Sequence, residues 1–110
     1  MAADPVLRAE LAHGLSDSSR QRILDLLRSG EHRVADVVEA TGLTQPNVSK
    51  HLRCLRGCGL VVSEKRGREV FYELADGLDE VLDALDALLA RVAPRMAACQ
   101  LTEATLGRRR

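Results

Sequence analysis

The stretch Leu43–Gly59, LTQPNVSKHLRCLRGCG, carries the strongest structural signal in the chain. Thr44 is a favourable N-cap residue, and Pro46 suits the first turn of a helix. Glycines near the end of the stretch predict where that helix stops. Three apolar residues recur at the i, i+4, i+7 spacing of one buried helical stripe: Val48, Leu52 and Leu55. We therefore predict a helix with one apolar face and one polar face.

The segments around this stretch predict further short elements. Apolar residues at helical spacing predict three helices before it, in segments 4–13, 20–30 and 34–42. After it, two β-prone runs at 61–65 and 69–74 flank Arg66-Gly67-Arg68 and predict a hairpin with a basic tip. A long amphipathic helix is predicted from residue 78 onward, and Pro94 is expected to bend or end it.

Two helices around a glycine-containing turn, followed by a basic hairpin, is the order of a winged helix-turn-helix. The predicted fold class is therefore mainly α with a small β-hairpin wing (α+β). We expect residues 1–99 to form a single DNA-binding and dimerisation domain, and residues 100–110 to form a loosely ordered tail. The amphipathic first and last helices predict a two-fold dimer, because a chain of 110 residues buries only a modest core alone.

Composition excludes several functional classes. Aromatic residues make up only 2% of the chain, so base stacking on aromatic platforms is not expected. The net charge is zero, but residues 44–68 hold six Lys or Arg against one acid, and residues 75–92 hold five acids against one Arg. No secretory signal or membrane span is visible, so we expect a cytoplasmic protein with reduced thiols and no membrane partner.

The polar face of the predicted helix suits the major groove of double-stranded DNA. Amide, hydroxyl and cationic side chains on such a face can bond base edges and phosphates. The alternative, a merely solvated basic surface, is less consistent with the combination of turn, apolar stripe and wing. The predicted contacts on the helix are Thr44, Gln45, Asn47, Ser49, Lys50 and Arg53, with Arg66 and Arg68 of the wing holding flanking phosphates.

Two of the three cysteines, Cys54 and Cys58, lie four residues apart in this helix. Such neighbours have Cβ atoms about 5–6 Å apart, and zinc–thiolate bonds are about 2.3 Å long, so one ion can bridge both sulfurs. Cys99 is a candidate third ligand, and three sulfur ligands favour soft ions. Two alternatives stay open. The cysteines can be small buried hydrophobes or a redox switch, although two thiols one helical turn apart form a disulfide poorly.

Three segments together resemble one family of bacterial regulators: LSDSSRQRIL, GLTQPNVSKHLRCLRGCGLV and EKRGREVFYEL. They are similar to the ArsR/SmtB family of metal-sensing repressors, and the resemblance spans roughly residues 5–93. It implies a homodimer of winged helices that represses a metal-resistance operon and releases DNA when metal binds.

Within that family, LRCLRGCGLVV resembles the cadmium- and lead-responsive type. The resemblance implies that Cys54, Cys58 and the partner's Cys99 hold one Cd(II) or Pb(II) per intersubunit site. Other family members place a cysteine pair where this chain has Arg33–Asp36, or a histidine on the last helix, which this chain lacks there. Neither of those other metal sites is expected here.

The sequence thus predicts a transcriptional repressor whose apo homodimer binds operator DNA and is released by Cd(II) or Pb(II). Alternatives are a thiol-redox-responsive regulator, an arsenite or Hg(II) sensor using the same thiols, and a protein-interaction module. An enzyme with a small-molecule substrate is not expected, because no catalytic set or phosphate-binding loop can be assembled from these residues.

Overall fold

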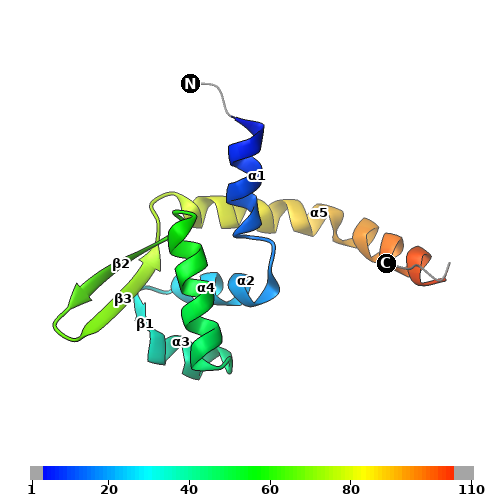
Figure 1. Cartoon of the computed structure of the whole chain (residues 1–110). Helices are drawn as coiled ribbons and strands as arrows, with labels where there is room; N and C mark the ends of the chain where they lie inside the picture. Colours follow the sequence, from blue (N-terminus) through cyan, green and yellow to red (C-terminus); the bar gives the residue numbers. More distant parts are fainter. Residues whose placement is uncertain (1–3, 106–110) are drawn as a thin grey trace. The chain divides into compact units, whose positions relative to one another are not determined.

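A computed structural model describes the backbone of residues 4–105 and the side chains of residues 4–99. The elements follow the chain in the order α1, α2, β1, α3, α4, β2, β3, α5 (Figure 1). The chain divides into two compact units, Met1–Leu78 and Asp79–Arg110, and the first holds every element before α5. No helix in the described residues is long and apolar enough to cross a membrane.

The first unit contains four helices besides its strands: α1 (Pro5–His13), α2 (Ser18–Leu27), α3 (Val34–Thr41) and α4 (Gln45–Gly57). Local capping explains where several of them begin. The Asp17 carboxylate accepts from the Arg20 amide at 3.1 Å, and the Thr44 hydroxyl accepts from the Asn47 amide at 3.3 Å. The helices predicted from the sequence are therefore present, with α2 starting two residues earlier than expected.

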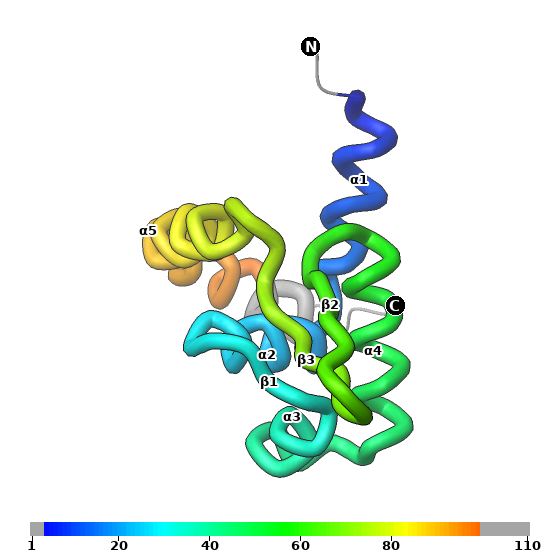
Figure 2. Tube along the Cα trace, turned by 90° about the vertical axis from the view of Figure 1, so that its left-hand side faces the viewer, coloured from blue at the N-terminus to red at the C-terminus, as the bar shows by residue number. Residues whose placement is uncertain are grey.

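The core of the first unit lies where α2, α3 and α4 meet the strands, and Figure 2 shows these elements gathered together. The predicted stripe of α4 is fully buried, which confirms the orientation inferred from its spacing. No side-chain polar atom is left buried without a hydrogen bond among the described residues. The apolar side chains with no exposed surface are Ile23, Leu24, Val37, Val48, Leu52 and Leu55.

The three strands are β1 (His32–Arg33), β2 (Val61–Arg66) and β3 (Glu69–Leu74), antiparallel in the order β1-β3-β2. The predicted hairpin is β2–β3, with Glu64 opposite Phe71 and Arg66 opposite Glu69. Strand β1 was not predicted, because two residues are too short for an alternating pattern. It pairs with β3 and places Arg33 opposite Phe71, so the wing is joined to the segment that leads into α3.

The second unit consists of α5 (Leu78–Thr105) from Asp79 onward. Of the two outcomes expected at Pro94, a bend or an end, the end is wrong, since helical backbone continues to Thr105. One missing amide donor does not end it, because alanines with high helix propensity follow. Helix therefore includes residues 100–105 of the segment predicted to be a loose tail, and residues 106–110 lie outside the described chain. Its exposed large apolar residues include Val81, Leu85, Leu88, Leu89 and Met96.

Candidate DNA-binding face and thiol site

The outer face of α4 brings the predicted DNA contacts of this helix together. The Gln45 amide donates to the Ser49 hydroxyl at 3.1 Å, which fixes two of the polar groups relative to each other. Within the described chain, no side-chain hydrogen bond or ion pair engages Lys50 or Arg53, so both cations are available to an outside partner. Ser49 is half-buried, and the exposed members of the set are Thr44, Gln45, Asn47, Lys50 and Arg53.

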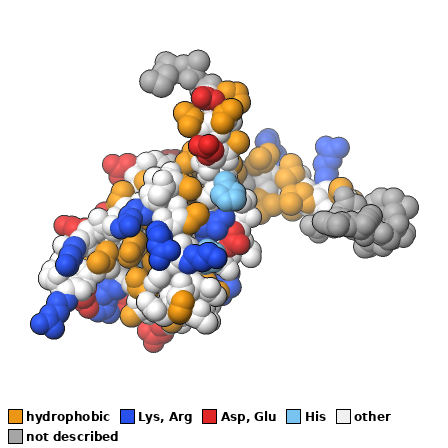
Figure 3. Space-filling view, in the orientation of Figure 1, with side chains coloured by type: hydrophobic (Ala, Val, Ile, Leu, Met, Phe, Trp, Pro, Cys, Tyr) orange, Lys and Arg blue, Asp and Glu red, His pale blue; other side chains and the backbone are white. Residues whose placement is uncertain are grey.

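Lys and Arg side chains gather over α4 and the wing (Figure 3). Arg56 is not among the predicted contacts, but it adds to this face because it follows Arg53 by three residues. Its Nη1 donates to the Ser63 hydroxyl of β2 at 3.4 Å, which joins the helix to the wing. The i, i+3 spacing of Arg53 and Arg56 was the available sequence signal.

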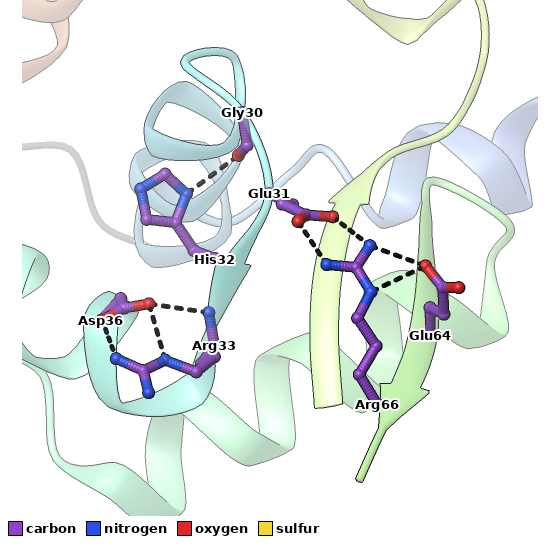
Figure 4. A network of polar contacts seen from close by, with 7 residues as sticks. All are labelled: Gly30, Glu31, His32, Arg33, Asp36, Glu64 and Arg66. Carbon is purple, nitrogen blue, oxygen red and sulfur yellow. Dashed lines mark hydrogen bonds and ion pairs between the residues drawn. The ribbon is translucent and has the colours of Figure 1, made fainter. Parts of the chain in front are cut away.

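The two wing arginines differ in their surroundings. Arg68 is exposed in the hairpin turn and has no partner in the described part of the chain. Arg66 donates to both carboxylate oxygens of Glu31, at 2.5 and 2.7 Å, and to Glu64 at 2.7 Å (Figure 4). The hydrogen bonds from Arg66 lower the pKa of Glu31. No sequence pattern pointed to this pairing, because Glu31 and Arg66 are 35 residues apart.

Both thiols of the CLRGC motif lie at the C-terminal end of α4. Cys54 is in its last turn, and Cys58 is the C-cap residue, whose amide donates to the Cys54 carbonyl at 3.0 Å. Gly59 has a φ of +79°, and the Leu60 amide returns to the Leu55 carbonyl at 2.9 Å. This Schellman closure needs a glycine at its left-handed position, and it holds Cys58 one helical turn after Cys54.

Residues of α1 lie beside the thiol of Cys58. A pocket next to Cys58 is lined by Leu7, Glu10 and Leu11 of α1 and by Gly57 of α4. Gly14 approaches so closely that an added Cβ would lie 3.4 Å from the Cys58 sulfur. Burial is the main cause that raises the pKa of the Cys58 thiol, and the neighbouring Cys54 raises it further through charge and hydrogen bonding. Cys58 is therefore protonated at neutral pH until a ligand displaces its proton.

The donor set fits a soft ion but is incomplete within the first unit. Cys54 and Cys58 are both half-buried, so a metal ion can reach either sulfur. Cys99, the predicted third ligand, is exposed on α5 in the second unit. In the described residues of a single chain, no three His, Cys, Asp or Glu side chains form a cluster that could hold a metal. The structure thus brings two of the three predicted ligands together.

The side chain of His51 on α4 is mostly buried, with 17% of its surface exposed. Its Nε2 is 3.9 Å from the Asp17 carboxylate that caps α2. Asp17 has a lowered pKa, chiefly because it accepts a hydrogen bond from the Arg20 amide. This placement beside a capping carboxylate fits a structural role for His51.

A recognition helix with a polar outer face, a preceding helix and a three-stranded wing define a winged helix-turn-helix transcription regulator. The family model described as bacterial regulatory protein, arsR family, matches residues 17–63. The transcriptional regulator CmtR of Mycobacterium tuberculosis is 42% identical over 105 residues, which cover 88% of this chain and 89% of CmtR. The chain therefore belongs to the ArsR family, also called ArsR/SmtB, of DNA-binding regulators.

Two further similarities extend this assignment. A probable mercury resistance operon repressor of Streptomyces lividans is 36% identical over 72 residues, which cover 66% of this chain and 58% of that protein. The solution structure of a homodimeric winged helix-turn-helix DNA-binding domain from Mycobacterium bovis is 28% identical. It superposes with a TM-score of 0.70 and covers 87% of this chain and 95% of that domain. The predicted family and fold class are confirmed.

Proposed function

We propose that this protein is a repressor whose apo homodimer binds a palindromic operator and leaves it when Cd(II) or Pb(II) is bound. The ligands would be Cys54, Cys58 and Cys99 of the partner subunit. One observation carries the proposal: the two adjacent thiols lie on the recognition helix itself, at the end opposite its capped N-terminus. A ligand held there acts directly on the element that reads DNA.

The DNA contacts would come from the polar face of α4 and from the wing. The residues are Thr44, Gln45, Asn47, Ser49, Lys50 and Arg53, with Arg68 at the hairpin turn. Exposed lysines and arginines without carboxylate partners neutralise phosphates and release counterions, which supplies most of the non-specific affinity. The amides and hydroxyls on the same face would supply base recognition.

The dimer is supported by apolar surface on each unit taken separately. In α1, Val6 and Leu7 expose more than half of their surface, and Leu11 is also exposed. In α5, the exposed apolar residues recur from Val81 to Leu89 along the helix. Contiguous apolar surface of this kind marks an association site, and a two-fold pair would present two recognition helices to two half-sites.

The thiols would form a three-sulfur site that suits large soft ions. Cys54 and Cys58 of one subunit and Cys99 of its partner would hold the ion, and its bonds to these thiolates would link α4 of one subunit to α5 of the other. Cys58 gives up its proton on binding, and Cys54 is held beside it by the helix. Release of DNA requires only that the liganded dimer prefer a geometry unsuited to the operator, and a coupling of about 1–3 kcal/mol is typical.

The test is a titration of reduced protein with Cd(II), Pb(II), Hg(II) and arsenite. Binding is monitored by the ultraviolet absorption of the thiolate-to-metal charge-transfer band. We expect saturation at one ion per subunit with Cd(II) and Pb(II), and loss of the signal in Cys54→Ser or Cys58→Ser. Saturation only with Hg(II) or arsenite would keep the thiol site and replace the ion. Peroxide that releases operator DNA reversibly, in a protein that binds none of these ions, would favour the redox alternative.

A further inference from the structure

We propose that the wing holds DNA phosphates through Lys65 and Arg68, whereas Arg66 is a positioning residue that tethers the wing to the segment before β1. This inference rests on the proposed operator binding. It changes one contact predicted from the sequence, because it replaces Arg66 by Lys65. The two faces of the hairpin carry different chemistry.

Register assigns the wing residues to two faces. Residues directly opposite each other in an antiparallel pair share a face, and successive residues alternate. Glu64, Arg66, Glu69 and Phe71 therefore lie on one face. Lys65 lies on the other, with Ser63 and the buried Val61 two and four residues before it.

The Lys65 face is the one turned toward the recognition helix. Arg56 of α4 donates to the hydroxyl of Ser63, so the helix lies on that side of the hairpin. Lys65 is exposed and has no hydrogen bond or ion pair among the described residues. A phosphate that approaches Arg53 and Arg56 on α4 therefore meets Lys65 next along the wing.

The Arg66 face is acidic and closed by internal pairs. Two carboxylates, Glu31 and Glu64, accept from the single Arg66 guanidinium, which lies 4.6 Å from the centroid of the Phe71 ring. On the same face Arg33 donates to Glu69 at 2.6 Å. Arg33 is also paired with Asp36, as Figure 4 shows. Counting these six charged groups, carboxylates exceed guanidinium groups by four to two, so a phosphate here would be repelled.

The Glu31–Arg66 pair fits a tether. The guanidinium reaches across β3 and is held by two parallel bonds, the geometry that makes an arginine–carboxylate pair directional. Both ends are partly exposed, so the pair adds little to global stability. Its effect is to restrict the hairpin relative to β1, and thereby to hold Lys65 and Arg68 beside α4.

The experiment measures operator affinity of the metal-free protein at several salt concentrations. Each phosphate contact contributes about 0.9 to the slope of log K against log salt on duplex DNA. We expect Lys65→Gln and Arg68→Gln each to lower the slope by about 0.9. Arg66→Gln and Glu31→Gln should leave the slope unchanged and weaken binding by no more than about fivefold at every salt concentration, the range of an exposed pair.

Hydrogen exchange of the DNA-free variants gives a second readout. Arg66→Gln and Glu31→Gln should both speed exchange of wing amides in residues 61–74, whereas Arg68→Gln should not. A lower salt slope in Arg66→Gln, an unchanged slope in Lys65→Gln, or tighter binding by Glu31→Gln would overturn the proposal. The slope of log K against log salt is measured on operator DNA and on a scrambled duplex. A protein with no preference for the operator would contradict the proposed function, but the slopes would still test the roles assigned to the wing residues.

Discussion

At the scale of single residues, the Cys58 thiol connects the fold to the chemistry proposed for it. Burial raises its pKa first, and the nearby Cys54 adds to the shift. In a Cys99→Ser background, Cys54→Ala should therefore lower the Cys58 titration midpoint while leaving it above the ordinary thiol range. Ultraviolet thiolate absorbance measures this midpoint, and a midpoint that Cys54→Ala raises would contradict the assignment.

The raised pKa of Cys58 also determines how metal affinity should change with pH. A thiol must lose its proton to ligate an ion, so a raised pKa makes metal binding weaken as pH falls. We expect the apparent Cd(II) affinity to rise steadily from mildly acidic to mildly basic pH. An affinity that does not depend on pH across this range would exclude a protonated Cys58 as a ligand.

The pKa of Asp36 is shifted in the opposite direction to that of Cys58, and this shift affects the stability of the fold. Its pKa is lowered below its ordinary 3.8, first by the side-chain hydrogen bond from Arg33. A lowered carboxyl pKa stabilises the fold above the ordinary value, and this contribution is lost as pH falls through the lowered value. Asp36→Asn should therefore melt below wild type at neutral pH, and the difference should begin to shrink below pH 3.8 and vanish once the pH is below the lowered pKa.

Thermal unfolding over a pH series measures this effect. The matched control is Glu39→Gln, which removes a carboxylate on the same helix that makes no hydrogen bond or ion pair in the described residues. The control should melt close to wild type at neutral pH. An Asp36→Asn deficit that persists unchanged in acid would mean that the charge of Asp36 is not its cause.

At the scale of elements, α4 depends on its buried stripe. Val48 has no exposed surface, whereas Val62 on β2 is 46% exposed. Val48→Ala removes two buried methyl equivalents and leaves a cavity, and should lower the free energy of unfolding by about 2 kcal/mol. Val62→Ala, the same chemical change, should cost less than about 1 kcal/mol. Chemical denaturation compares the two, and equal losses would contradict the packing described for α4.

Some elements of the fold could be predicted from the sequence and others could not. The stripe of α4 and the β2–β3 hairpin were predictable because helical spacing and turn residues are local signals. Strand β1 was not, since His32 and Arg33 form a strand only by pairing with β3. The sequence left open whether Pro94 bends or ends α5, because propensity on both sides of a proline decides whether one lost donor ends a helix.

In the candidate site, too, local features were predictable from the sequence and tertiary contacts were not. The i, i+4 spacing of Cys54 and Cys58 and the polar face of α4 followed from one helix, so they were predictable. The pairing of Arg66 with Glu31 was not predictable, because the two residues are distant in sequence. Local pattern identifies a charged residue, and only the tertiary pairing determines whether that charge is available to DNA.

At the scale of the whole molecule, the proposed site spans two subunits, and a mixed dimer tests this. One subunit carries Cys99→Ser, and the other carries Cys54→Ser together with Cys58→Ser. If Cys99 binds across the interface, the mixed dimer keeps one complete three-thiolate site, whereas each parent homodimer keeps none. We therefore expect mixing to restore strong Cd(II) binding at one ion per dimer. No gain over the parent homodimers would show that the ligands do not combine across subunits.

The central claim is that soft-metal binding removes this repressor from DNA. The most direct measurement is fluorescence anisotropy of the reduced protein on DNA from its own upstream region, with Cd(II), Pb(II) or Zn(II) added at about one ion per subunit. We predict tight binding without metal, loss of binding with Cd(II) or Pb(II), and little change with Zn(II). Tight binding that no metal alters would contradict the claim and leave the CLRGC thiols to packing or redox chemistry.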